Sequence, residues 1–255
     1  MRRMKGRIFL ATAFFIVAGL VFYVGAKFSK GDNVLSRVAK PADLVSDSLS
    51  LDGVSQLVSE GICDVEIFSS DRELMVVSYD ATHTTNHSKV NGTKLNIHFA
   101  VDHIGFFDFT IRPDVKVQIY TQHLDTLINI GTGNITGKDT MERNSLYLVN
   151  DGVGSIEYTT KARSVVAKNS GIGSLDIFGF TDELFAINEG VGSMNTNKLI
   201  ALNVKARNSG VGSLAVYASD SLDIANDGVG SLIYSGPGEV HSSRNVGIGS
   251  IKKRE

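Results

Sequence analysis

Two acidic residues, Glu157 and Asp176, are the first candidates for chemistry in this sequence of 255 residues. They stand 19 positions apart, which is also the mean spacing of a motif repeated along the second half of the chain. If each repeat forms one coil of a stacked β-structure, the two carboxylates lie about 5 Å apart on neighbouring coils. A pair at that separation suits a retaining glycosidase or one calcium ion. An ordinary solvated face with one unfavourable pair is the favoured interpretation, because no basic or aromatic subsite surrounds the two residues.

Histidine and cysteine give weaker signals. His83 and His87 have a spacing that binds metal on a helix, but their segment, DATHTTNHSKVNGT, is typical of a polar loop. Cys63 is the only cysteine, which excludes an intramolecular disulfide and a cysteine-based zinc site, and its strand-like setting GICDVEIF predicts a small core residue. No Ser-His-Asp or Cys-His arrangement can be argued. We therefore expect no catalytic residue, no metal site and no cofactor.

Three aromatic residues, Phe178, Phe180 and Phe185, gather within the segment DIFGFTDELFAI. An exposed aromatic patch of this kind can contact a sugar or a protein. Packing within a longer loop is the favoured interpretation.

The elements that must position all these residues are set by a repeat, Asn-x-Gly-x-Gly-Ser. A degenerate copy begins at Asn129, and the mean spacing of the copies is about 19 residues. A period of this length with strand-like alternation predicts an all-β solenoid with one coil per repeat. The six regular copies begin at Asn150, Asn169, Asn188, Asn208, Asn226 and Asn245.

Alternation within each coil separates the inside from the outside. Small or aliphatic residues stand two and four positions before each asparagine in every coil but the last, whereas Lys168 and Arg207 occupy intervening positions. Asparagine therefore shares the inward face, where each side-chain amide can bond to the asparagine one coil away. Two further columns, three and six residues after the asparagine, are expected in the core: Thr132, Val153, Ile172, Val191, Val211, Val229 and Ile248, and then Ile135, Ile156, Leu175, Met194, Leu214, Leu232 and Ile251.

The paired glycines of the motif are predicted to be structural. They bracket a corner, where glycine permits a positive φ and lets stacked coils approach to about 4.8 Å. A nucleotide-binding loop is excluded because no helix follows, and calcium-binding nonapeptide repeats need an Asp where this motif has Ser and then an apolar residue. With the asparagines, the predicted structural ladder includes Gly152, Gly154, Gly171, Gly173, Gly190 and Gly192.

The residue directly after each asparagine forms an outward column. No two acids in it stand on neighbouring coils, as expected of a solvated edge that avoids like-charge repulsion, and this argues against a metal-binding column. The column reads Asp151, Ser170, Glu189, Ser209, Asp227 and Val246.

The N-terminus predicts a membrane segment. Residues 1–7 carry four positive charges and no negative one, and residues 8–26 are uncharged. As a helix, the uncharged run is about 28 Å long, close to the ~30 Å of bilayer hydrocarbon. We expect residues 1–26 to form a single-pass anchor with the basic leader in the cytoplasm and the remainder exported. The alternative is a signal peptide cleaved after Val24-Gly25-Ala26, which also exports the body.

The rest of the chain divides into three parts. Residues 27–48 are predicted to be a polar tether, residues 49–128 irregular strand-rich first coils or a cap, and residues 129–255 a regular solenoid of seven coils. With 26 Gly but only 3 Pro, the composition excludes collagen and a disordered Pro/Gly linker. Loss of residues 1–26 changes the net charge from −2 to −6, so no nucleic-acid partner is expected.

A family resemblance rests on three stretches. LSLDGVSQLVSEGICDVEIFSSDRELMVVSYD, then NGTKLNIHF, then the Gly-x-Gly corners resemble the head GIN domain family, the auto-transporter adhesin heads of bacterial envelope proteins, over roughly residues 50–250. The resemblance implies a right-handed parallel β-helix on an exported bacterial protein. It brings no catalytic residues with it.

The sequence thus favours an exported, membrane-anchored envelope protein with a non-catalytic adhesion, binding or structural role. Its expected contacts are the membrane through residues 8–26 and an envelope protein or a glycan. We expect an inner-membrane location with the solenoid in the periplasm or outside, or secretion if the segment is cleaved. Two alternatives remain open: a carbohydrate-active enzyme that uses Glu157 and Asp176, and a structural or regulatory subunit of an envelope complex.

Overall fold

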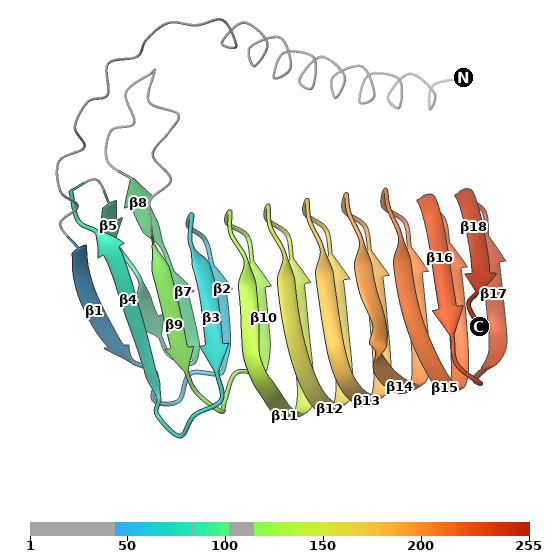
Figure 1. The fold of residues 1–255 in the computed structure, drawn as a ribbon, viewed down its shortest axis with the longest axis horizontal. Helices are drawn as coiled ribbons and strands as arrows, with labels where there is room; N and C mark the ends of the chain where they lie inside the picture. The colour runs from blue at the N-terminus through green and yellow to red at the C-terminus, as the bar shows by residue number, and fades with distance from the viewer. Residues whose placement is uncertain (1–43, 83, 102–114) are drawn as a thin grey trace, which may run out of the picture. The chain divides into compact units, whose positions relative to one another are not determined.

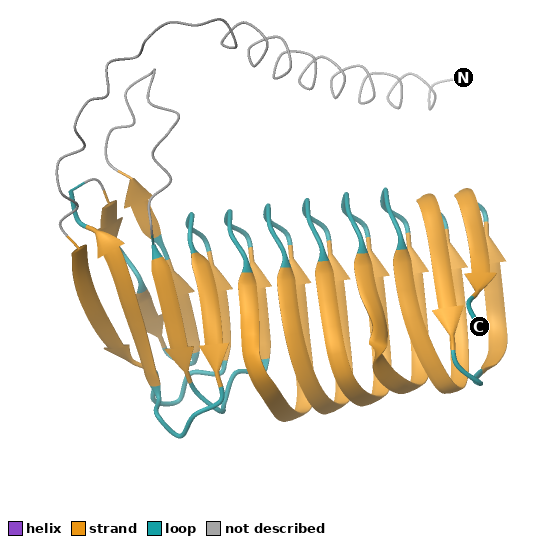
Figure 2. Ribbon diagram, viewed as in Figure 1, coloured by secondary structure: helices purple, strands orange, loops and turns teal. Residues whose placement is uncertain are grey.

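Five long parallel strands, each making most of one coil, form the middle of the protein (Figure 1). The computed structural model describes residues 44–82, 84–101 and 115–255, and all regular structure in these residues is β-strand (Figure 2). Each long strand pairs in parallel with the next, and the register aligns one motif asparagine with another, as in Asn150 with Asn169 and Asn169 with Asn188. The predicted all-β solenoid with coils of about 19 residues is therefore confirmed. The strands are β11 (Ile135–Asn150), β12 (Ile156–Asn169), β13 (Leu175–Asn188), β14 (Met194–Asn208) and β15 (Leu214–Asn226).

Each coil bends twice. The long strand curves at one edge of the solenoid, and the Asn-x-Gly-x-Gly corner returns the chain at the opposite edge, where the corners form a row of short loops (Figure 2). Isolated parallel bridges join the middle residue of one corner to the next, for example Val153 to Ile172 and Ile172 to Val191. The corners are therefore stacked in register like the strands.

The last coil is built from shorter strands. A break at residues 236–238 separates two of them, and β15 pairs with both. The chain then turns through a final motif corner into a strand that pairs with the first of these short strands. The three strands are β16 (Val229–Ser235), β17 (Glu239–Asn245) and β18 (Ile248–Lys253).

The first coils do not follow chain order. One coil, made by β2 (Gln56–Ser59) and β3 (Asp64–Phe68), pairs directly with β10 (Thr126–Asn129) and β11. The coil that follows it in sequence, with β7 (Lys94–Ile97) and β9 (Lys116–Tyr120), lies on its other side. The chain therefore passes outward and back before it enters the regular coils.

Antiparallel strands cover the outer edge of these first coils. β4 pairs with β9 and β1 pairs with β4, while β6 pairs with β7. Such strands satisfy backbone groups that a bare edge leaves unpaired. A separate two-stranded sheet joins β5 and β8. The bounds are β1 (Leu44–Ser50), β4 (Leu74–Asp80), β5 (Thr84–Asn86), β6 (Lys89–Asn91) and β8 (Phe99–Val101).

The core lies between the two arms of the coils. The column six residues after each asparagine is buried from Ile135 to Leu232. The small or aliphatic residues two and four positions before each asparagine, such as Leu148 and Leu146 before Asn150, are also buried. These parts of the predicted core are confirmed. The interior is a continuous stack of aliphatic side chains, one layer per coil.

The column three residues after the asparagine was expected in the core, and that prediction is wrong. Val153, Ile172 and Val191 are exposed by 49%, 54% and 42%. The corner does not reverse the strand alternation, so odd positions after the inward asparagine point outward and even ones point inward. In the motif copies the inward even positions are the two glycines, where a Cβ would overlap the backbone of the adjacent coil.

The predicted membrane segment in residues 1–26 lies outside the described residues. The described part of the chain contains no helix with the length and apolarity that a membrane span requires. Strand β1 begins at Leu44, inside the range predicted as a tether.

Candidate binding groove along the glycine corners

A ladder of buried amides fixes the corners. Each motif asparagine donates from Nδ2 to Oδ1 of the next asparagine at 2.9–3.0 Å, from Asn129 through to Asn245. In most coils the same Nδ2 also donates to the carbonyl of the second glycine of its own corner, as Asn150 does to Gly154 at 3.0 Å. The asparagines from Asn129 to Asn226 are buried, while Asn245, in the last coil, is exposed. From Asn150 to Asn245 both Nδ2 and Oδ1 of each amide are bonded, so the ladder holds these corners in the same shape.

The two glycines allow the corners to stack without intervening side chains. A Cβ on Gly171, the first glycine of its corner, would overlap the carbonyl oxygen of Gly152 in the preceding coil. Gly173, the second glycine, has φ of 144°, and a Cβ there would overlap the carbonyl oxygen of Gly154. Only glycine fits either position. The result is a floor of bare backbone that runs from coil to coil.

A groove of about 670 Å³ follows this floor. It crosses five consecutive corners, parallel to the solenoid axis, and Phe99 lines it beside Gly61. The residues before and after the first glycine of each corner form its two walls. The lining comprises Glu60, Gly61, Ile62, Phe99, Ile130, Gly131, Thr132, Asp151, Gly152, Val153, Ser170, Gly171, Ile172, Glu189, Gly190 and Val191.

One wall is an aliphatic ridge, and it continues beyond the groove to the last coil. Apart from Thr132 its members are Val or Ile, and each is at least 42% exposed. Exposed aliphatic side chains in a continuous row are typical of an interaction surface. The aliphatic ridge comprises Ile62, Thr132, Val153, Ile172, Val191, Val211, Val229 and Ile248.

The other wall is acidic. Glu60, Asp151 and Glu189 alternate in it with the neutral Ile130 and Ser170. No Lys or Arg lines the groove. We call these five residues the acidic wall, and they favour a positively charged ligand.

The acids of this column differ in their pairing. Lys168 Nζ lies 2.9 Å from a Glu189 carboxylate oxygen, and this hydrogen-bonded contact raises the pKa of Lys168. Farther along the column, Asp227 accepts from Arg207 and Arg244. Within the described residues, neither Glu60 nor Asp151 takes part in a salt bridge. Asp151 is near enough to Lys168 to contribute to its raised pKa, so the negative charge of the groove is least compensated at Glu60.

The predicted acidic pair lies elsewhere. Glu157 and Asp176 are register neighbours on β12 and β13, but neither lines the groove. Asp176 accepts hydrogen bonds at both oxygens, from Ser174 Oγ at 2.8 Å and from Asn195 Nδ2 at 2.7 Å. This arrangement ties Asp176 into a polar surface network of neighbouring strands. Among the residues that the structure describes, no group of three or more His, Cys, Asp or Glu is placed to hold a metal ion.

The histidine prediction is only partly covered, since His83 lies outside the described residues. His87 is exposed between β5 and β6, with its ring centroid 6.0 Å from that of His98.

The three phenylalanines lie on a strand. The expectation of a longer loop is wrong, because β13 runs without interruption through Phe178, Phe180 and Phe185. Lys198 Nζ lies 5.4 Å from the ring centroid of Phe178, and Lys205 Nζ lies 5.6 Å from that of Phe185. Both contacts come from neighbouring positions on β14 and are cation–π interactions.

An eighth corner was missed by the sequence comparison of repeats. The segment SEGICD, residues 59–64, occupies the motif position: Ser59 aligns with Asn129, and Ile62 bridges Thr132. Cys63 replaces the second glycine, is buried and contacts Ser59 Oγ at 3.6 Å; burial raises its pKa to about 11. Glu60, Gly61 and Ile62 match the acid, the first glycine and the aliphatic residue of the motif, and they are the only signal of this corner in the sequence. The asparagine and the second glycine of the motif are absent.

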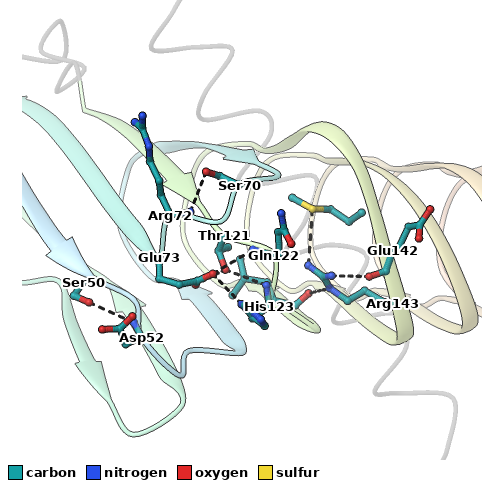
Figure 3. Close-up of polar contacts among 12 residues, drawn as sticks. Ser50, Asp52, Ser70, Arg72, Glu73, Thr121, Gln122, His123, Glu142 and Arg143 are labelled. Atoms are coloured by element: carbon teal, nitrogen blue, oxygen red, sulfur yellow. Dashed lines mark hydrogen bonds and ion pairs between the residues drawn. The ribbon is translucent and has the colours of Figure 1, made fainter.

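Figure 3 shows polar contacts at the junction between the first coils and the regular ones. Glu73 accepts from buried Thr121 Oγ1 at 2.7 Å and lies 2.8 Å from His123 Nδ1. One coil farther on, Arg143 donates from Nε to the carbonyl of Leu124 at 2.7 Å. These contacts fix the segment 121–125, through which the chain returns to the regular coils.

A parallel β-solenoid places the protein among the repeat proteins, in which each structural repeat contacts only its neighbours. The chain belongs to the family described as "Putative auto-transporter adhesin, head GIN domain", which matches residues 54–238. The sequence resemblance to that family is confirmed.

Solved structures share this fold at low sequence identity. A "putative adhesin" from Bacteroides fragilis is 20% identical, with a TM-score of 0.73 over 83% of this chain and 97% of that one. A "putative adhesin" from Parabacteroides distasonis is 18% identical, with a TM-score of 0.63 over 84% and 98%. A "putative lipid binding protein" from the same species is 18% identical, with a TM-score of 0.58 over 83% and 97%. None of the curated proteins compared with this sequence matches it.

Proposed function

We propose that this protein is a non-catalytic binding protein of the bacterial cell envelope, and that it holds an extended ligand in the groove along its glycine corners. The single observation that carries the proposal is the groove itself, with an exposed aliphatic ridge on one side and an acidic wall on the other. Soluble proteins rarely leave a continuous apolar row in water without a partner. The adhesin description of the family supports a binding role.

The decisive experiment compares two matched substitutions. Ile172→Asp places a charge in the aliphatic ridge, and Ile200→Asp places one on β14 outside the groove, at a residue of similar exposure, 54% against 48%. The full chain in detergent micelles is sedimented with isolated bacterial envelopes. We expect Ile172→Asp to reduce the bound fraction severalfold and Ile200→Asp to leave it unchanged. Equal binding by both variants contradicts the groove as the site.

Membrane anchoring by residues 1–26 is part of the proposal. Their basic leader and uncharged run support it. Protease treatment of intact cells and of spheroplasts tests it: the solenoid is expected to be protected in intact cells if it lies in the periplasm and accessible in both if it lies outside. Protection in both preparations contradicts export.

The non-catalytic role is tested through the neighbouring carboxylates. Glu157→Gln combined with Asp176→Asn is compared with the parent for release of reducing ends from envelope polysaccharides. We expect no release by either protein. Release by the parent that disappears in the variant would establish the glycosidase alternative instead.

A further inference from the structure

The acids beside the groove follow a strict alternation once the coils are placed in spatial order. The coil at residues 59–64 stacks directly on the coil of Asn129, which places Glu60 next to Ile130 in the outward column. The column then reads acid, neutral, acid, neutral over eight coils. Its members in spatial order are Glu60, Ile130, Asp151, Ser170, Glu189, Ser209, Asp227 and Val246.

Ion pairs accompany this alternation at two of the four acids. Acids and bases on alternate coils keep like charges apart, and they attract each other. Such bases stand on the neutral coils: Lys168, on the coil of Ser170, pairs with Glu189. Arg207 and Arg244, on the coils of Ser209 and Val246, both pair with Asp227. The acids keep a fixed spacing, and within the described residues Glu60 and Asp151 are the two that form no salt bridge.

That spacing selects a ligand conformation. Strands in a sheet are about 4.8 Å apart, so acids on alternate coils repeat about every 9.6 Å. A polyproline II helix repeats every three residues, which is about 9.3 Å. An extended β-strand returns a side chain to the same face about every 6.8 Å, and seven residues of α-helix span about 10.5 Å. Of these three repeats, that of the polyproline II helix is nearest to the spacing of the acids.

We propose that the groove binds a peptide segment in the polyproline II conformation with Lys or Arg at every third residue. This inference rests on the proposed binding function. A polyproline II helix has three faces: the basic face pairs with Glu60, Asp151 and Glu189, an apolar face packs on the aliphatic ridge, and the third faces water. Glu60 and Asp151 are the main anchors because Glu189 already forms an ion pair with Lys168.

Synthetic peptides test the spacing directly. The probes are (Pro-Pro-Lys)4 and a control with the same composition in two blocks, Lys4Pro8, titrated into the full chain in detergent micelles at low and high salt. We expect the spaced peptide to bind at least severalfold more tightly than the block peptide, and its affinity to fall as salt rises. Equal affinity for the two peptides would show that net charge alone acts and would overturn the proposal.

Matched variants locate the peptide in the groove. Glu60→Gln with Asp151→Asn is expected to weaken the spaced peptide on the order of tenfold. Glu157→Gln with Asp220→Asn removes the same charge outside the groove and should have no effect. Equal losses in the two double variants would contradict the site. Chitosan oligomers, which are basic glycans, are titrated in a separate experiment. If the protein binds chitosan but not (Pro-Pro-Lys)4, the ligand is a glycan and the peptide proposal is overturned. If the protein binds neither the peptide nor chitosan, but its sedimentation with envelopes still depends on Ile172, the proposed peptide ligand is wrong and the proposed binding function of the groove is retained.

Discussion

The motif asparagine holds each corner through its side-chain hydrogen bonds. We expect the loss of unfolding free energy on its substitution to depend on its position in the ladder. Asn188 is buried, accepts from Asn169 and donates to Asn208. Asn188→Ala leaves these partners unsatisfied inside the protein and should lower the free energy of unfolding by about 2–4 kcal/mol. Asn245→Ala, at the exposed end of the ladder, should cost less than about 1 kcal/mol. Urea unfolding measures both, and similar losses would contradict a cooperative ladder.

Glycine contributes in two separable ways. Gly53 has φ of 73° with open space around it, whereas Gly171 lies against the backbone of Gly152. Gly53→Ala tests backbone strain alone and should cost about 1 kcal/mol. Gly171→Ala forces neighbouring coils apart and should cost at least about 3 kcal/mol or prevent folding. Thermal unfolding of the two variants provides the comparison, and a larger effect at Gly53 would refute the steric reason for the motif.

Cys63 gives the protein a dependence on alkaline pH. Its pKa in the folded state is about 11, above the usual 9.0, because burial disfavours the thiolate. A folded pKa above the unfolded one favours folding below pH 9, and this contribution is lost as the pH rises from 9 toward 11. The loss should be on the order of 2 kcal/mol. Cys63→Ala has no thiol and should not lose stability in this way. The unfolding free energy of the parent should therefore fall relative to that of the variant between pH 8 and pH 10.5, as measured by urea unfolding.

At the scale of elements, the sequence predicted what repeats and missed what departs from the repeat. The Asn spacing predicts the coils and the buried column from Ile135 to Leu232 because every copy carries the same physical constraint. The prediction places the ridge residues from Thr132 to Ile248 in the core because of their mostly apolar type. Strand alternation through the corner instead turns residues such as Val153 outward. The coil at residues 59–64 does not align with the motif in sequence, because Ser59 and Cys63 stand in place of the asparagine and the second glycine. The next copy of the motif, at Asn129, also comes 70 positions later instead of about 19.

The junction between the first coils and the regular ones is an element-scale contact that no periodicity predicts. Glu73 is the acceptor of the buried Thr121 hydroxyl, and its side chain is only 15% exposed. Glu73→Ala should destabilise the protein by about 1–3 kcal/mol because it leaves that hydroxyl without its acceptor. The control is Glu142→Ala, which removes an exposed pair with Lys161 and should cost less than about 0.5 kcal/mol. Urea unfolding that ranks the two variants in the opposite order would contradict this role.

At the scale of the whole molecule, a solenoid is a sum of coils that contact only their neighbours, so its length is adjustable. Deletion of residues 170–188 joins Asn169 to Glu189 and restores an intact motif with one coil fewer. Deletion of residues 170–208 joins Asn169 to Ser209 and removes two coils in the same way. Both proteins should fold, and the urea m-value should fall by about a tenth for each coil removed. Failure of both to fold would contradict the modular stack.

The two deletions differ in the order of charges beside the groove, which makes them a test of spacing at constant fold. Removing one coil places Asp151 and Glu189 on neighbouring coils, about 4.8 Å apart, and breaks the alternation. Removing two coils gives Asp151, Ser209 and Asp227 in succession, so the alternation of about 9.6 Å is kept. We expect the two-coil deletion to retain its preference for (Pro-Pro-Lys)4 over Lys4Pro8 and the one-coil deletion to lose it. The same preference in both proteins would show that the ligand does not measure the distance between coils.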